Sequence, residues 1–242
     1  MTSHPIVSRE KWIAARINLL AEEKEFTRRR DALSRHRRDL PWVKIDDYVF
    51  DGPAGKVRLS ELFRGKSQLI VYHLMFHPDW SVACKSCSFW ADNFERVVIH
   101  LRGRDVNLAA VSRASVDTIA RFKSRMGWTF EWVSCGPDGV FNHDFGAYLT
   151  KEDLAREGNN SNYGTRRFDI EDVPAISVFF KDADGSLYHT YSTYSRGLDM
   201  LNGAYHYLDI VPRVATRTSL DTTWNGCACA TNKHSRPASD LG

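Results

Sequence analysis

The sequence lacks three features that would assign whole classes of function. No apolar run approaches the roughly 20 residues that a membrane-spanning helix needs. The first residues, MTSHPIVSREKW, contain no apolar segment of the kind that directs secretion. The net charge of +3 over 242 residues gives no positive excess that would indicate nucleic-acid binding. These absences predict a cytoplasmic protein whose partner is neither a membrane nor a nucleic acid.

Cysteine is scarce, with five in the chain. In a protein expected in the reducing cytosol, so few cysteines argue against a structural disulfide framework and for metal or redox chemistry. Two of them form the motif Cys84-Lys85-Ser86-Cys87. The apolar content of 43% is sufficient for a buried core around such a motif.

Hydrophobic periodicity divides the chain into three parts. Residues 8–39 have the pattern of one long charged helix, which Pro41 ends, so residues 1–41 are predicted to form an N-terminal helical arm. Residues 42–212 are predicted to form the main domain. From residue 213 to 242 the composition is polar and periodicity is absent, which predicts a C-terminal tail.

Within the main domain, short segments rich in β-branched and aromatic residues alternate with helical patterns. The predicted strands are a hairpin around 51–55, buried strands at 69–76, 105–112 and 130–134, and a second hairpin of 175–180 with 186–191. The predicted helices follow Cys87 and cover 115–126 and 197–208. This alternation predicts an α/β fold with parallel strands. Residues 136–172 interrupt it and are predicted to be an insertion, either a lid near the site or an inert surface excursion.

The buried strand at 69–76 delivers Cys84 to the start of a helix. Unpaired N–H groups and the helix dipole favour an anion there, and the charge of Lys85 adds to this, so the pKa of Cys84 is expected to be low. Cys87 lies three residues further along the same helical face, at a separation of roughly 5–6 Å that a disulfide can bridge. Arg113 leaves the next strand at the same edge of the sheet, so we expect it nearby.

The order of these elements resembles a thioredoxin fold, a three-layer α/β/α sandwich, with an N-terminal helical extension and an insertion. The segments YHLMFHPDW, CKSCSFWADNF, VSRA, RMGWTFEWVS and HTYSTYSRGLD further resemble a bacterial family of predicted dithiol–disulfide oxidoreductases, the domain of unknown function 899 family. The resemblance implies exchange with disulfides of proteins or small thiols, without a cofactor. It assigns Cys84 as the nucleophile and Cys87 as the resolving thiol. It also assigns Pro174, after Val173, as a cis proline facing them.

The sequence departs from thioredoxin-like patterns around the dithiol. Lys85 stands where such motifs often have proline, and the buried aspartate of thioredoxin has no counterpart, with His73 and His77 nearest in sequence. Trp80 and Lys85 are predicted to support the site. Tail residues Cys227 and Cys229 either relay electrons to the dithiol or are incidental.

Three alternatives stay open. A peroxiredoxin-like thiol peroxidase would use Pro78, Ser81 and Cys84 as its loop, with Arg113 polarising the peroxide rather than forming a surface salt bridge. A zinc-binding module would need two ligands beyond the CxxC pair, such as Cys227 and Cys229. A non-catalytic thioredoxin-fold module is the third alternative, and a homodimer is compatible with all of them.

Overall fold

The computed structural model describes residues 4–156, 162–165 and 167–212. The chain divides into two compact units, one ending at Pro41 and the other beginning at Trp42. The predicted tail, with Cys227 and Cys229, lies outside the described residues. No helix in the part of the chain that the structure describes is long and apolar enough to cross a membrane.

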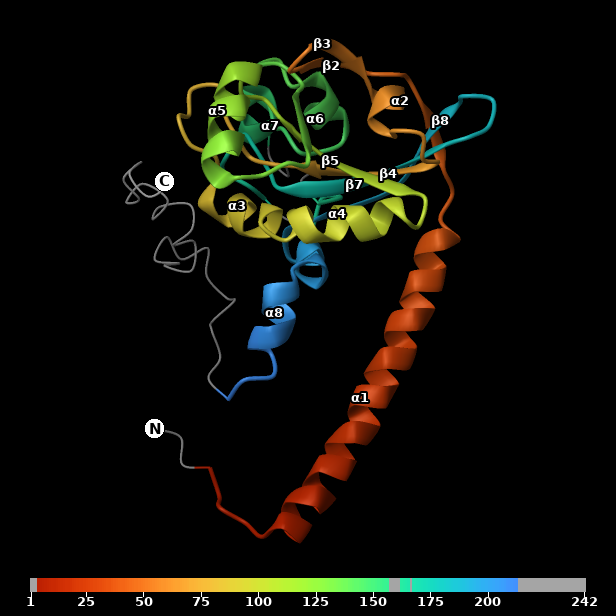
Figure 1. Ribbon diagram of the computed structural model, residues 1–242, viewed down its shortest axis with the longest axis vertical. Coiled ribbons are helices and arrows are strands. Elements are labelled where there is room, and N and C mark those ends of the chain that lie inside the picture. Colours follow the sequence, from red (N-terminus) through yellow and green to blue (C-terminus); the bar gives the residue numbers. More distant parts are fainter. Residues whose placement is uncertain (1–3, 157–161, 166, 213–242) are drawn as a thin grey trace, which may run out of the picture. The chain divides into compact units, whose positions relative to one another are not determined.

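The first unit consists of helix α1 (Arg9–Arg38), as the sequence predicts (Figure 1). The Ser8 side chain caps it by accepting a hydrogen bond from the Lys11 N–H, and the helix ends at Asp39, two residues before Pro41. Glu25 forms ion pairs with Arg28 and Arg29 at helical spacing. No residue of α1 is buried, so capping and ion pairs along the helix are its own sources of stability.

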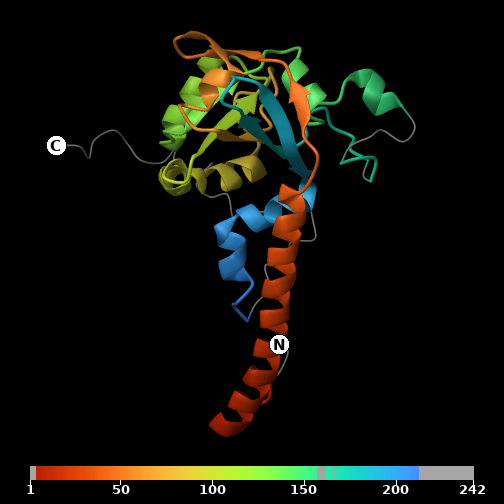
Figure 2. The ribbon, with the colours of Figure 1, turned by 90° about the vertical axis from the view of Figure 1, so that its right-hand side faces the viewer.

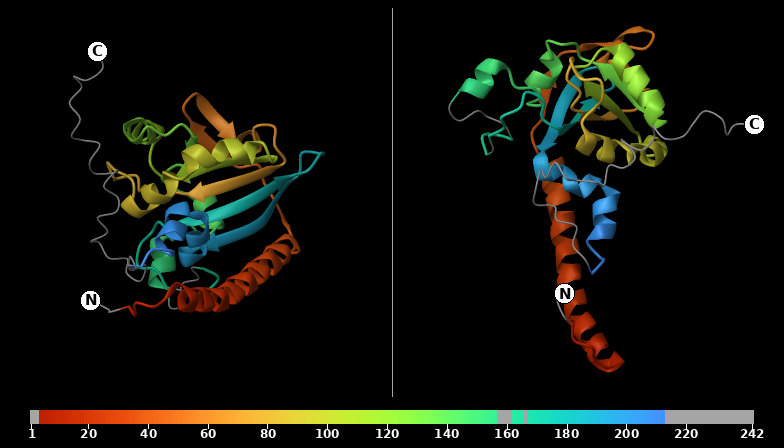
Figure 3. Two further views of the ribbon diagram at one scale, coloured as in Figure 1. Left: turned by 60° about the horizontal axis from the view of Figure 1, so that its bottom comes forward. Right: turned by 90° about the vertical axis from the view of Figure 1, so that its left-hand side faces the viewer.

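The described residues of the second unit form an eight-stranded sheet in the order β1-β8-β7-β4-β5-β6-β2-β3. The strands are β1 (Val43–Ile45), β2 (Val49–Gly52), β3 (Gly55–Arg58), β4 (Gln68–His73), β5 (Val106–Ser112), β6 (Glu131–Ser134), β7 (Ala175–Lys181) and β8 (Leu187–Tyr194). Strands β4, β5 and β6 are parallel, whereas β7 and β8 run antiparallel to their neighbours. Figure 3 shows β4, β7 and β8 side by side. The parallel strands at the centre of the sheet agree with the predicted α/β fold.

Helices cover both faces of this sheet. They are α2 (Leu59–Leu62), α3 (Lys85–Ala91), α4 (Phe94–Arg102), α5 (Val116–Met126), α6 (Val140–Asp144), α7 (Lys151–Ala155), the 3-10 helix η1 (Ser195–Leu201) and α8 (Gly203–Leu208). One core cluster joins α3, α4 and α5 to one face, and a second joins α2 and α6 to the other. The fold is therefore the predicted α/β/α sandwich.

The insertion leaves the sheet after β6 and returns before β7. It contains the two short helices α6 and α7. Figure 2 shows α7 standing away from the sheet. A bridge between Tyr148 and Asp172 closes the insertion on itself where it rejoins the sheet.

Two predicted helices are each broken in two. The helix after the CxxC motif stops at Asp92 and restarts at Phe94, because the Asn93 amide donates hydrogen bonds to the Phe89 carbonyl and the Asn202 side chain. The final helix breaks at Asn202, whose side chain caps α8 by accepting from the Ala204 N–H. These two asparagines join the breaks to each other, so the last segment of the domain is fastened beneath the CxxC helix.

The first predicted hairpin is only partly correct. Strands β2 and β3 pair around the predicted turn. Residues 43–50 were expected to form the first arm as one strand, but residues 43–45 form a separate strand, β1, which pairs with β8 at the opposite edge of the sheet. The peptide between them, around Asp46 and Asp47, therefore crosses from one edge of the sheet to the other. Sequence alternation identified the strand-forming residues but could not identify their partners.

Candidate functional site

The ends of β4 and β5 meet where the chain turns toward the dithiol. The Leu74 N–H donates to the Val111 carbonyl at 2.9 Å, and the Ala114 N–H donates to the Phe76 carbonyl at 2.8 Å. The Cys84 N–H then donates to the Met75 carbonyl at 3.1 Å. This ladder places Cys84 at the edge of the sheet at which the parallel strands end, as the strand order predicts.

Cys84 is the N-cap residue of α3 and is partly exposed. A hydrogen bond from the Cys87 thiol lowers the pKa of Cys84 from 9.0 to about 6, against the effect of burial, and the N–H groups of Cys87 and Ser86 add to the lowering. Lys85 is exposed on the helix surface. The low pKa of Cys84 therefore comes chiefly from hydrogen bonds at the helix start, and at neutral pH Cys84 is predominantly a thiolate.

Cys87 has the opposite environment, with 1% of its surface exposed. Burial raises its pKa well above 9.0, and the neighbouring Cys84 sulfur raises it further. Neither cysteine is in a disulfide. The pair thus combines an accessible, ionised sulfur with a buried, protonated one, which is the division of labour that attack and resolution require.

Tyr72, which sequence reasoning overlooked, lies behind the dithiol. It is fully buried, on the face of β4 that packs against the CxxC helix, and its ring meets that of Phe94 edge-on at 5.1 Å. Among the described residues its hydroxyl has no hydrogen-bond partner. Burial raises the pKa of Tyr72 well above 10.0, and the sulfurs of Cys87 and Cys84 raise it further, so the hydroxyl lies next to the dithiol. The alternation of Ile70, Tyr72 and Leu74 along the strand was the available signal.

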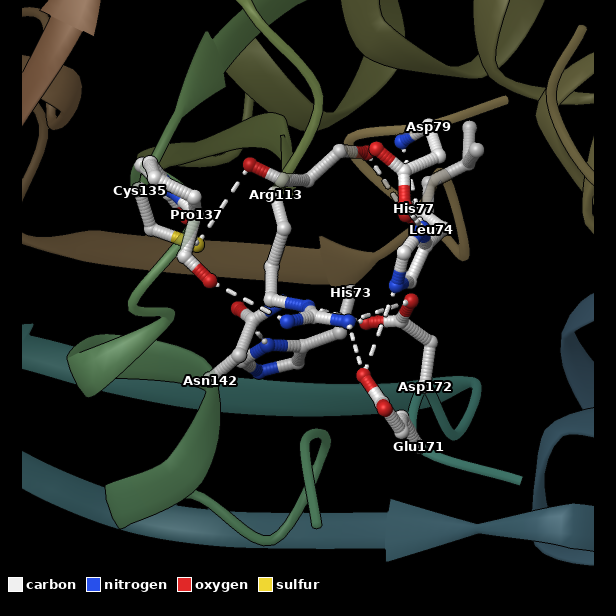
Figure 4. A network of polar contacts seen from close by, with 12 residues as sticks. His73, Leu74, His77, Asp79, Arg113, Cys135, Pro137, Asn142, Glu171 and Asp172 are labelled. Carbon is white, nitrogen blue, oxygen red and sulfur yellow. Dashed lines mark hydrogen bonds and ion pairs between the residues drawn. The ribbon is translucent and has the colours of Figure 1, made fainter. Parts of the chain in front are cut away.

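The two histidines proposed near the dithiol are engaged elsewhere. His73 points to the opposite face of β4, where its ring nitrogens lie 2.9 Å from Asn142 Oδ1 and 2.9 Å from Ser177 Oγ. Burial lowers its pKa to about 4, so it is a neutral packing residue. The His77 Nδ1 accepts the Asp79 N–H, and its Nε2 lies 3.4 Å from Glu171 (Figure 4). Neither histidine is positioned to exchange protons with Cys87.

Arg113 lies at the centre of a buried ion cluster (Figure 4). Its Nε donates to Asp172 at 2.8 Å, and its terminal nitrogens donate to Glu171 at 2.9 Å and to the Pro137 carbonyl at 3.1 Å. The guanidinium also lies over the Tyr148 ring at 3.8 Å. The salt bridge expected for Arg113 is therefore buried, not superficial, and it fastens the insertion to the end of β5.

The peptide bond between Val173 and Pro174 is trans, which corrects the predicted cis proline. Hydrogen bonds on either side, from the Leu149 N–H to Glu171 and from the Val173 N–H to Ala147, hold the segment extended as it enters β7. The trans form is also the intrinsically favoured one for an X–Pro bond. The register of β7 against β4, with Ala175 opposite His73, still places Pro174 at the edge of the sheet that carries the dithiol.

Two further candidates are Trp80 and Cys135. Trp80 is 40% exposed on the loop before Cys84, and its ring lies beside His77. Cys135 donates to the Ser112 carbonyl, and burial raises its pKa to about 12, so it is a poor nucleophile. In residues 4–212, apart from the gaps given above, no three His, Cys, Asp or Glu side chains are grouped so that they could hold a metal ion.

A family model described as "Bacterial protein of unknown function (DUF899)" matches residues 1–227. No curated protein matches the chain. Among solved structures, the chain is similar to peroxidoxin BcpB from Mycobacterium tuberculosis, with 12% identity, 70% of this chain and 97% of that one covered, and a TM-score of 0.46. It is also similar to a putative thiol:disulfide interchange protein DsbE from Chlorobium tepidum, with 14% identity, 68% and 91% covered, and a TM-score of 0.39.

Proposed function

The chain belongs to a bacterial family of unknown function, and for it we propose a thiol–disulfide oxidoreductase in which Cys84 attacks and Cys87 resolves. The observation that carries the proposal is the difference in acidity between two adjacent sulfurs, one lowered to about 6 at a helix start and one raised by burial. Substrates are disulfides of proteins or small thiols. Because the resolving sulfur lies beneath the surface, the substrate contacts Cys84 first.

The low pKa of Cys84 serves two steps. It makes the thiolate available to attack a substrate disulfide, and it makes the same sulfur a good leaving group when the substrate is exchanged back. The raised pKa of Cys87 keeps that thiol protonated until a mixed disulfide has formed on Cys84. The two sulfurs therefore act in a fixed order.

Alkylation of the reduced protein tests this assignment. Iodoacetamide should modify Cys84 first, with a midpoint near pH 6, while Cys87 stays unmodified. A Cys135→Ser variant is the matched control and should give the same profile, because the raised pKa of the half-buried Cys135 keeps it protonated. A midpoint near 9.0 without preference between Cys84 and Cys87 would contradict the proposal.

A thiol peroxidase is the second candidate function, and the ion pairs of Arg113 argue against it. The guanidinium that would polarise a peroxide is instead bound by Asp172 and Glu171 in a buried cluster. We expect oxidised glutathione to form a mixed disulfide with Cys84 much faster than hydrogen peroxide oxidises it. A faster reaction with peroxide would favour the peroxidase.

A further inference from the structure

An unpartnered hydroxyl lies beneath the dithiol. Tyr72 is fully buried, yet no hydrogen-bonding atom of the described chain meets its hydroxyl in proper geometry. A buried polar group without a partner costs roughly 1–3 kcal/mol. The ring alone would fill the same space, since it already packs edge-on against Phe94 at 5.1 Å. Packing therefore explains the ring of Tyr72 but not its oxygen.

The surroundings of that oxygen are the dithiol itself. Tyr72 and Cys87 belong to the same buried cluster, and Cys84 packs against it. The polar groups that act on the phenol are the sulfurs of Cys87 and Cys84 and the hydroxyl of Tyr205. Asp172 and Glu171 are bound to Arg113 instead, and His73 faces the other side of the sheet. The phenol is thus the side-chain hydrogen-bond donor of β4 that faces Cys87, and the backbone N–H of Met75 is a second donor to the same sulfur.

The resolving step creates a need for such a donor. When Cys84 is joined to a substrate sulfur, Cys87 must lose its proton and attack Cys84. The bond between the two cysteine sulfurs forms as the bond to the substrate sulfur breaks, and the substrate leaves as a thiolate that regains a proton. Cys84 and Cys87 are oxidised together, and the substrate disulfide is reduced. Negative charge develops on a fully buried sulfur, where ionisation is otherwise strongly disfavoured.

We propose that the Tyr72 hydroxyl donates a hydrogen bond to the Cys87 sulfur as it ionises, and so accelerates resolution of the mixed disulfide. This inference rests on the proposed function. The phenol keeps its own proton throughout, because its pKa lies well above 10.0. The phenolate, which is the form that could act as a base, is therefore not present at neutral pH. A thiolate is a stronger acceptor than a thiol, so the contact that is incomplete in the reduced protein tightens when charge appears.

The role differs from that of a buried carboxylate. A carboxylate would take the proton from the resolving thiol, whereas a phenol can only stabilise the thiolate after the proton has left. The hydrogen bond lowers the pKa of Cys87 without reversing the effect of burial. Burial therefore keeps Cys87 protonated at rest, and the contact with the phenol strengthens while Cys87 reacts.

The experiment follows the mixed disulfide with oxidised glutathione. The reduced protein is mixed with it, quenched with acid after increasing times, and the fraction carrying glutathione on Cys84 is measured by mass spectrometry. In Tyr72→Phe we expect formation at the normal rate and resolution roughly tenfold to hundredfold slower, the range for losing a hydrogen bond to a charged group. Replacing Tyr72 with a ring-fluorinated tyrosine, a stronger donor of nearly the same size, should speed resolution.

Tyr194→Phe is the matched control. Its hydroxyl is also buried but donates to the Phe145 carbonyl at 2.7 Å, so its loss should reduce stability and leave resolution unchanged. Equal lifetimes of the mixed disulfide in the wild type, Tyr72→Phe and the fluorinated protein would overturn the inference while leaving the proposed function intact. If Cys87→Ser traps no glutathione on Cys84, the proposed function fails as well.

Discussion

Tyr72 and His73 are consecutive residues of the same buried strand, but their side chains face opposite sides of the sheet. On the His73 side, hydrogen bonds link Asn142, His73, Ser177 and Ser192 in a continuous chain, which His189 extends at 2.7 Å. On the Tyr72 side, the buried hydroxyl has no partner among the described residues, and the neighbouring sulfurs have strongly shifted pKa values. A saturated polar network stabilises one state, whereas an unsaturated one leaves capacity for charge that appears during a reaction.

The largest effect should come from replacing the cysteine on each side of the sheet with serine, in separate variants. Cys84→Ser should reduce glutathione exchange to the background rate, because no other thiolate is present at the helix start. Cys135→Ser, on the His73 side of the sheet, should retain full activity, since its thiol is protonated at neutral pH. Steady-state turnover of both variants measures the contrast. Activity that survives Cys84→Ser but disappears with Cys135→Ser would reverse the comparison.

Replacing His73 should damage the fold without damaging the chemistry. His73→Leu removes two hydrogen bonds and leaves the buried Asn142 Oδ1 without the partner it has in the wild type, while Ser177 keeps its bond to Ser192, so we expect a loss of about 2–4 kcal/mol in the free energy of unfolding. Urea denaturation gives that value. Resolution of the mixed disulfide, measured below the unfolding transition, should be unchanged. A slow resolution in this variant would show that the two sides are coupled.

The sequence predicted the features that depend on neighbouring residues, but not the contacts between residues far apart in the chain. The alternation of residues 69–76 and the spacing of Cys84 and Cys87 identified the strand, the helix start and the reactive sulfur, because these depend on local geometry. The partners of Arg113 lie 58 and 59 residues further along the chain, and those of His73 lie 69 and 104 residues away. Such contacts are set by the sheet order, which explains why the sequence could not give the partners of Arg113 or of His73.

Two errors have more specific causes. The cis bond at Pro174 was expected from the resemblance, whereas the bridge between Tyr148 and Asp172 that holds the segment extended belongs to the insertion. The break at Asn93 depends on Asn202, which no helical pattern indicates. The unpartnered state of Tyr72 could not be predicted at all, since it requires knowing every neighbour of one oxygen.

The pH dependence of stability should also separate the two sides. Burial lowers the pKa of His73 from 6.5 to about 4, so the unfolded chain takes up a proton at higher pH than the folded one. Stability should therefore be unaffected above 6.5 and fall as the pH decreases toward 4, by about 3 kcal/mol in total. Urea denaturation at a series of pH values measures this loss. In His73→Gln the same pH change should cost less, and an identical slope would assign the loss to other groups.

The smallest effect is expected for Tyr72→Phe. Removing a hydroxyl that has no partner leaves nothing unsatisfied, so the free energy of unfolding should change by less than about 1 kcal/mol, in either direction. The two variants should therefore have opposite outcomes. His73→Leu should lose stability, and Tyr72→Phe should resolve the mixed disulfide more slowly. Urea denaturation of Tyr72→Phe checks the first half of that pair. A loss as large as that of His73→Leu would show that the hydroxyl has a structural partner.

The ion cluster around Arg113 has a consequence for shortening the protein. Residues 136–172 look dispensable as an insertion into a common fold, and deleting them would be a natural route to a minimal domain. Yet they supply Glu171, Asp172 and the Pro137 carbonyl, which together receive the Arg113 guanidinium at the end of β5. Deleting them alone would leave the Arg113 guanidinium buried without its ion-pair partners, beside the loop that leads to Cys84. A shortened protein must therefore also have Arg113 replaced with an apolar residue, because the arginine and the insertion depend on each other.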